Sequence, residues 1–166
     1  MIPDLQTIQA AAIRIKHYIH RTPVLTSRCI NEMTGAEIWF KCENLQKVGA
    51  FKSRGACNAV FSLSDEEVTH GVGTHSSGNH AQALARAASI RGCKAYIVMP
   101  ETSPKVKSDA VRGYGGEITF CKPTLEARES TLAEIIHRTG ATEIHPYNDY
   151  RVIAGQATAA MELIEE

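Results

Sequence analysis

From residue 71 onward the sequence alternates between short apolar runs and longer amphipathic stretches. The apolar runs predict strands over 71–75, 94–98, 117–121 and 142–145. The stretches between them predict helices over 80–91, 104–113 and 125–138. Strands that alternate with helices of this length are typical of βαβ units. The sequence therefore predicts an α/β fold with a parallel sheet, whose ligands bind at the carboxyl ends of the strands.

The chain before residue 71 carries weaker signals. Isoleucines and alanines at helical spacing predict a helix over 4–19, which Asp4 can cap. Further on, the sequence predicts a short helix over 27–33 that Gly35 closes, and a strand over 37–42. A final helix begins near Tyr150, and the sequence stops within it.

Composition excludes several classes of protein. With 43 % hydrophobic and 22 % charged residues, the 166-residue chain has the composition of an ordinary globular protein. Its formal net charge is zero, which gives no support for a nucleic-acid or membrane partner. No apolar run approaches the roughly 20 residues that a membrane span needs, and the start of the chain lacks a signal-peptide pattern. Five scattered cysteines without a C-x-x-C pair favour reduced thiols and a cytoplasmic location.

One lysine has an unusual setting. Lys52 follows Phe51 in a turn between Gly49 and Gly55, directly before a predicted helix over 53–63. If Ser53 caps this helix, the amine lies at the positive end of the helix dipole. That field and burial against the aromatic ring both lower the pKa of a lysine. A neutral amine can form a Schiff base, although an isolated lysine in a turn is more often an ordinary surface residue.

A second motif follows in Thr74-His75-Ser76-Ser77-Gly78-Asn79-His80-Ala81. An apolar run leads into small polar residues and then into an Ala-rich helical stretch. This pattern indicates a strand, a tight turn and a helix N-terminus. Free backbone N–H groups at such a terminus can hold an anion such as a carboxylate.

Together the two motifs resemble the fold-type II pyridoxal-phosphate (PLP) enzymes, most closely the serine racemases and serine/threonine dehydratases. The resemblance continues through Thr22-Pro23-Val24-Leu25, Phe40-Lys41-Cys42-Glu43, Ala95-Tyr96-Ile97-Val98 and Ala154-Gly155-Gln156. It implies a tryptophan-synthase-β-like parallel αβα sheet, present here as an N-terminal fragment. Residues 1–50 would be the N-terminal segment of the large PLP domain, 51–147 the small inserted domain, and 148–166 the start of the return to the large domain.

The resemblance also assigns roles. Lys52 would hold PLP through a Schiff base and act as a base on one face of the substrate Cα. Phe51 would lie beside the cofactor ring, and Asn79 would hydrogen-bond its phenolic oxygen. The substrate carboxylate would be bound by Ser76, Ser77, Gly78 and His80, mostly through main-chain N–H groups. Ser77 would supply the second acid/base on the opposite face, as a serine does in serine racemases; simple hydrogen bonding in the turn is the alternative.

Other family features are weaker in this sequence. Ser27, Lys47, Gln82 and Tyr114 match positions that bind a nucleotide effector in some serine racemases. Val48 replaces a hydroxyl residue and Arg28 a small one at this site, so an ATP site is not favoured. Ala157 is a separate departure, at a position where relatives commonly have glycine. His75 and His80 invite a metal site, but core or hydrogen-bonded histidines fit their spacing better. The Gly-rich phosphate cup and any Mg²⁺ site of the family would lie beyond Glu166.

The expected function is therefore PLP-dependent racemisation, β-elimination to a 2-oxo acid and ammonia, or both, acting on serine or threonine in a complete, homodimeric enzyme. Three alternatives remain: a threonine dehydratase without racemase activity, an inert folding or interaction module, and a nicotinamide-binding domain. The last rests on Gly71-Val72-Gly73, where Ser76 replaces the third glycine. Alone, the chain is expected to form a folded small domain with a loosely attached N-terminal arm.

Overall fold

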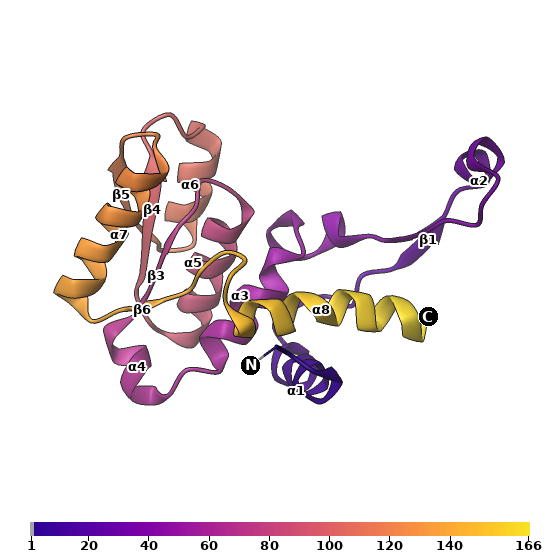
Figure 1. Ribbon diagram of the computed structural model, residues 1–166, viewed down its shortest axis with the longest axis horizontal. Helices are drawn as coiled ribbons and strands as arrows, with labels where there is room; N and C mark the ends of the chain where they lie inside the picture. Colours follow the sequence, from indigo (N-terminus) through magenta and orange to yellow (C-terminus); the bar gives the residue numbers. More distant parts are fainter. Residues whose placement is uncertain (1) are drawn as a thin grey trace.

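The computed structural model describes residues 2–166, and a parallel four-stranded sheet lies at one end of it (Figure 1). Its strands are β3 (Val72–His75), β4 (Ala95–Pro100), β5 (Glu117–Cys121) and β6 (Thr142–Glu143), in the order β5-β4-β3-β6. All three strand pairs are parallel. The predicted α/β fold is confirmed, with strand bounds within two residues of those expected.

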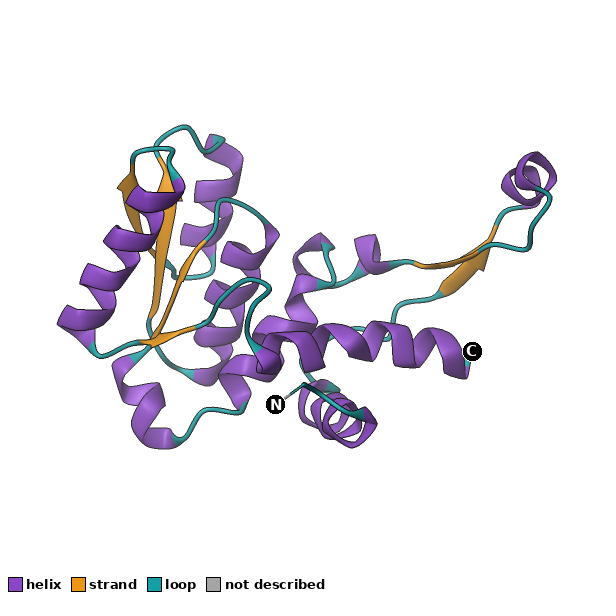
Figure 2. Cartoon of the chain, viewed as in Figure 1, coloured by secondary structure: helices purple, strands orange, loops and turns teal. Residues whose placement is uncertain are grey.

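Helices cover both faces of this sheet (Figure 2). Helices α5 (Asn79–Arg91) and α6 (Lys105–Gly113) lie on one face, and α7 (Leu125–Thr139) lies on the other. Side chains alternate along β4 as a strand requires. Ile97 and Met99 join the larger core under α5, whereas Val98 packs with Leu132 of α7. The result is the three-layer arrangement expected of this fold class.

Helix ends follow the local sequence closely. Gly92 and Gly140 close α5 and α7 in the left-handed conformation that glycine adopts most easily. One helix, α4 (Asp65–His70), was not predicted, although Ser64 and Glu67 form a complete capping box at its start.

Helices α3 (Lys52–Phe61) and α8 (Tyr150–Glu165) join the N-terminal segment to the sheet layers. Helix α3 packs against both α5 and α8. Helix α1 (Leu5–Ile15) lies across α8, with Ala11 and Ile15 fully buried. The expectation of a loosely attached N-terminal arm is therefore wrong for α1. The helix also ends earlier than predicted, at Ile15 rather than residue 19.

The projecting part of the chain is instead the segment from β1 (Val24–Thr26) through α2 (Arg28–Thr34) to β2 (Trp39–Lys41) (Figure 1). The two short strands pair antiparallel, and α2 buries none of its residues. An isolated two-stranded ribbon is only marginally stable in water. Two 3₁₀ turns, η1 (Glu43–Leu45) and η2 (Lys47–Gly49), lead back to α3.

No helix within residues 2–166 combines the length and apolar character of a membrane span. All five cysteines are free thiols. The predicted domain boundaries fall in the turn before α3 and in the loop between β6 and α8, and they stay predictions.

Candidate active site

Lys52 is the first residue of α3, and Phe51 stands at the capping position before it. Ser53 does not cap the helix as expected: it lies inside the first turn, where its hydroxyl donates to the Lys47 carbonyl at 2.6 Å. Lys52 Nζ donates to the Pro146 carbonyl at 2.8 Å. Burial lowers the pKa of Lys52 below the ordinary lysine value. The Lys52 amine therefore loses its proton more readily than an exposed lysine does.

Two consecutive residues before Lys52 have a left-handed backbone conformation. Val48 has φ +54°, a left-handed conformation that is rare for a β-branched residue, and Gly49 follows at φ +67°. A strained residue of this kind persists only where its surroundings fix it. The turn therefore presents Phe51 and Lys52 in a fixed direction.

A cavity of about 460 Å³ opens beside Lys52. Its walls come from the start of α3 and from the loop and first turns of α8: Phe51, Lys52, Pro146, Tyr147, Val152, Ile153, Gln156 and Ala157. The lysine amine lies 5.2 Å from the centre of the Phe51 ring, which is 42 % exposed. A mostly apolar cavity with one primary amine at its wall suits an aromatic aldehyde. The residues present therefore fit the aldehyde and ring of PLP.

The second motif forms the turn between β3 and α5, at the carboxyl edge of the sheet. The Ser76 N–H donates to the Val98 carbonyl, and the Gly78 N–H donates to Ser76 Oγ at 3.3 Å. Within residues 2–166, the N–H groups of Ser77, Asn79, His80 and Ala81 have no acceptor. These four groups, at the positive end of α5, can bind a carboxylate.

His80 takes part through its backbone only. Its ring is 2 % exposed, and Nε2 lies 3.2 Å from the Ile144 carbonyl, so Nε2 carries the proton. Burial lowers the pKa of His80 to about 4. The ring is therefore neutral and has no further N–H to offer a carboxylate. Similarly, His75 is buried and lies edge-on to His145, with ring centres 5.7 Å apart.

The segment after β6 connects the two motifs. Its Ile144 carbonyl faces His80, and its Pro146 carbonyl accepts from Lys52. The lining of the Lys52 cavity, however, does not include the Ser76–Asn79 turn. Lys52 and Phe51 thus line one cavity, whereas Ser77 and Asn79 do not. The Ser76–Asn79 turn and Lys52 both lie next to the loop that follows β6.

The four residues suggested for a nucleotide effector do not come together in this chain. Lys47 belongs to η2, Gln82 to α5, and Tyr114 closes α6, and these elements are neighbours. Ser27 instead caps α2 in the projecting segment, on the side of the molecule away from α6 (Figure 1). No group of three or more metal-ligating side chains occurs in the described part of the chain.

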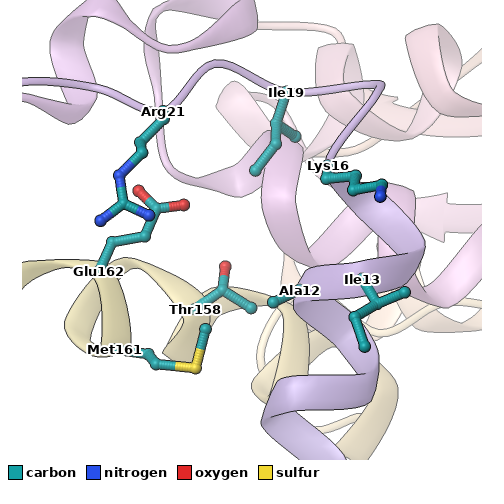
Figure 3. A pocket seen from close by; sticks show the side chains of 8 residues that line it. All are labelled: Ala12, Ile13, Lys16, Ile19, Arg21, Thr158, Met161 and Glu162. Atoms are coloured by element: carbon teal, nitrogen blue, oxygen red, sulfur yellow. The ribbon is translucent and has the colours of Figure 1, made fainter. Parts of the chain in front are cut away.

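A second cavity, of about 260 Å³, lies between α1 and α8 (Figure 3). Its lining includes Ile13, Lys16, Arg21 and Met161 but none of the predicted site residues. Sequence reasoning missed Pro146 and Gln156, which complete the first cavity. Gln156 Oε1 accepts from the Gly55 N–H at 3.3 Å, and its buried Nε2 has no partner within residues 2–166. Only the resemblance around Gly155-Gln156 could have pointed to it.

The chain is similar to known proteins in both sequence and structure. The chain is 56 % identical over 162 residues to the serine racemase of Dictyostelium discoideum, covering 98 % of this chain and 50 % of that protein. It is 54 % identical over 165 residues to the β-hydroxyaspartate dehydratase of Paracoccus denitrificans, covering 99 % and 52 %. The structure of maize serine racemase matches with a TM-score of 0.97 at 47 % identity, covering 99 % of this chain and 50 % of that one.

The chain spans about half the length of the curated relatives it matches. Residues 15–166 match the family model described as "Pyridoxal-phosphate dependent enzyme". This match, together with the fold and the lysine-bearing cavity, shows that the chain belongs to the pyridoxal-phosphate dependent enzyme family.

Proposed function

We propose that this chain carries the lysine-bearing half of an enzyme that racemises serine, deaminates serine or threonine by β-elimination, or does both. The observation that carries the proposal is Lys52, a partly buried amine of lowered pKa at the wall of an aromatic-lined cavity. Similarity to a serine racemase and to a β-hydroxyaspartate dehydratase supports the substrate class, small amino acids with a 3-hydroxyl group.

In this proposal Lys52 would hold the cofactor through its aldehyde, Phe51 would lie beside the ring, and Asn79 would hydrogen-bond the phenolic oxygen. Bound PLP supplies an electron sink for negative charge that develops at the substrate Cα. Ser77, Asn79 and His80 offer free main-chain N–H groups for the substrate carboxylate, while the Ser76 and Gly78 N–H groups are already bonded.

Two side chains move protons in this scheme. Lys52 Nζ would take the proton from one face of Cα, and burial, which lowers its pKa, makes the neutral amine easier to form. Delivery of a proton from Ser77 Oγ to the opposite face inverts the centre. Departure of the β-hydroxyl as water would instead give an unsaturated amine, which a second water molecule hydrolyses to a 2-oxo acid and ammonia. The Ser77 hydroxyl is therefore the feature that separates a racemase from a plain dehydratase.

Borohydride reduction in the presence of PLP, followed by peptide mapping, tests the central assignment. The pyridoxyl group should be found on Lys52 and should disappear in Lys52→Ala. Modification of Lys41 or Lys47 in place of Lys52 would contradict it. A homodimer, a cytoplasmic location supported by the free thiols, and an Mg²⁺ site outside this chain are further parts of the proposal. ATP binding is not proposed, because the four matching residues do not come together here.

A further inference from the structure

Arg54, two residues after Lys52, is the largest fully buried side chain of the core, with 0 % exposure. Its guanidinium forks onto two carboxylates. Nε and Nη2 donate to Glu43 at 2.8 and 2.7 Å, and Nη1 and Nη2 donate to Glu162 at 2.7 and 2.8 Å. Planar, two-sided recognition of this kind needs the fixed fork of arginine.

The charges around Arg54 are balanced. Lys41 Nζ lies 2.9 Å from Glu162 and donates to the Thr22 carbonyl, while Thr22 Oγ1 donates to Glu43 at 2.6 Å. Two cations therefore face two carboxylates. Burial is the largest influence and opposes ionisation of both acids. The hydrogen bonds and charge of Arg54, together with Thr22 at Glu43 and Lys41 at Glu162, outweigh burial and lower the pKa of both carboxyl groups. Arg21 extends toward Glu162 from the other side (Figure 3).

Lys41, Glu43, Arg54 and Glu162 come from four separate elements, β2, η1, α3 and α8, and Thr22 comes from the segment before β1. The cluster fixes the first turn of α3 from one side. On the other sides, Ser53 Oγ bonds Lys47, and the Gly55 N–H bonds Gln156. The three residues that follow Lys52 are thus all tied to other segments of the chain, while Lys52 itself lines the cavity.

We propose that Arg54 is a positioning residue for Lys52, which it keeps at the cavity wall by fixing the first turn of α3 between Glu43 and Glu162. The proposal rests on the proposed function only in treating Lys52 as the cofactor lysine. The action is geometric, because two carboxylates neutralise the Arg54 charge. A lysine at position 54 would keep the charge but lose the two-sided fork.

The pH dependence of Lys52 labelling tests this on the 166-residue chain without cofactor. Trace acetic anhydride labels neutral amines only. Mass spectrometry of the Lys52 peptide at a series of pH values gives the pH midpoint of Lys52 labelling. The exposed Lys94 and Lys105 serve as internal references. In Arg54→Lys, looser packing should solvate the Lys52 amine and move its midpoint up toward about 10.4. A rise of one unit would lower the neutral fraction about tenfold at a fixed pH below the midpoint.

A matched control separates positioning from general destabilisation. Leu132→Ala opens the other core cluster, beneath α7, and should leave the Lys52 midpoint unchanged. If Arg54→Lys does not fold, Glu43→Gln provides the test, because in that variant Arg54 retains its bonds to Glu162. The Lys52 midpoint should then rise by less than in Arg54→Lys. Folded Arg54→Lys or Glu43→Gln with the wild-type midpoint, or an equal shift in Leu132→Ala, would overturn the proposal. Pyridoxyl mapping to another lysine would contradict the proposed function and leave this result standing.

Discussion

Gly155 of α8 faces Gly55 of α3 so closely that a Cβ added to Gly155 would lie 2.7 Å from the Gly55 Cα. The same Cβ would lie 2.6 Å from the Arg54 carbonyl oxygen. Such distances leave room for hydrogen alone. The close crossing sets Gln156 against the Gly55 N–H and forms one wall of the cavity beside Lys52. Backbone contact between two helices thus shapes the site.

The first prediction is that Gly155→Ala destabilises the chain. The added methyl group meets backbone atoms, which cannot turn aside, so the two helices must separate. Overpacking of this kind typically costs about 1–3 kcal/mol. The free energy of unfolding, measured by urea denaturation, should fall by that amount.

Gly113→Ala is the matched control. Gly113 is also helical, at the end of α6, but a Cβ there would meet nothing within 4 Å. That variant should be neutral or more stable, since alanine restricts the unfolded chain. Equal effects of the two substitutions would refute the close-contact explanation.

Local sequence signals predicted most of the sheet and its helices, because strand periodicity, glycine caps and capping residues act within a few positions. The start of α3 was misplaced for a different reason. Ser53 is a good capping residue by type, yet its hydroxyl bonds the Lys47 carbonyl and the helix begins one residue earlier. The contact between Ser53 and the Lys47 carbonyl therefore decided whether Ser53 capped the helix or lay inside its first turn.

The site was predictable only in part. The motifs indicated Lys52 and Phe51, but the partner of Lys52 is the Pro146 carbonyl, 94 residues away. Arg54 and Glu162 are 108 residues apart, and nothing in the local pattern distinguishes that arginine from an exposed one. Long-range pairing of polar groups leaves no periodic signal in a single sequence.

The second prediction concerns pH. The pKa of His80 is about 4 when folded, below the ordinary value of about 6.5. The unfolded chain therefore takes up a proton before the folded chain does as the pH falls. The stability that His80 contributes is complete above pH 6.5 and is lost between pH 6.5 and 4. From pH 7 to pH 5 the loss should be about 2 kcal/mol.

His80→Gln isolates this effect, because glutamine keeps an N–H donor for the Ile144 carbonyl but does not titrate. Urea denaturation at pH 7 and pH 5 should show a shallower fall in stability for this variant than for the wild type. His137→Gln, an exposed change on α7, should keep the wild-type fall. Identical pH dependence in His80→Gln would show that the buried ring is not the cause.

The third prediction separates racemisation from elimination in the complete enzyme. If Ser77 is the opposite-face acid/base, Ser77→Ala should lower formation of D-serine from L-serine by about 100-fold or more. Pyruvate release from L-serine should persist at least in part, because Lys52 can still take the Cα proton. Chiral chromatography and a pyruvate assay measure the two products. Equal loss of both activities would mean that Ser77 only positions the substrate.

The last prediction is that the 166-residue chain alone does not turn over L-serine when PLP is added. The described residues offer an amine, an aromatic neighbour and free N–H groups at one helix end, while the family's phosphate-binding turn is expected after Glu166. The phosphate is the most highly charged part of the cofactor, and its donors also orient the ring. Misplacement of a reacting group by about 1 Å can cost around 100-fold in rate. Absorbance in the visible range and pyruvate release, followed together, provide the measurement. Steady turnover with a saturable visible band from this chain would show that residues 2–166 hold PLP productively by themselves.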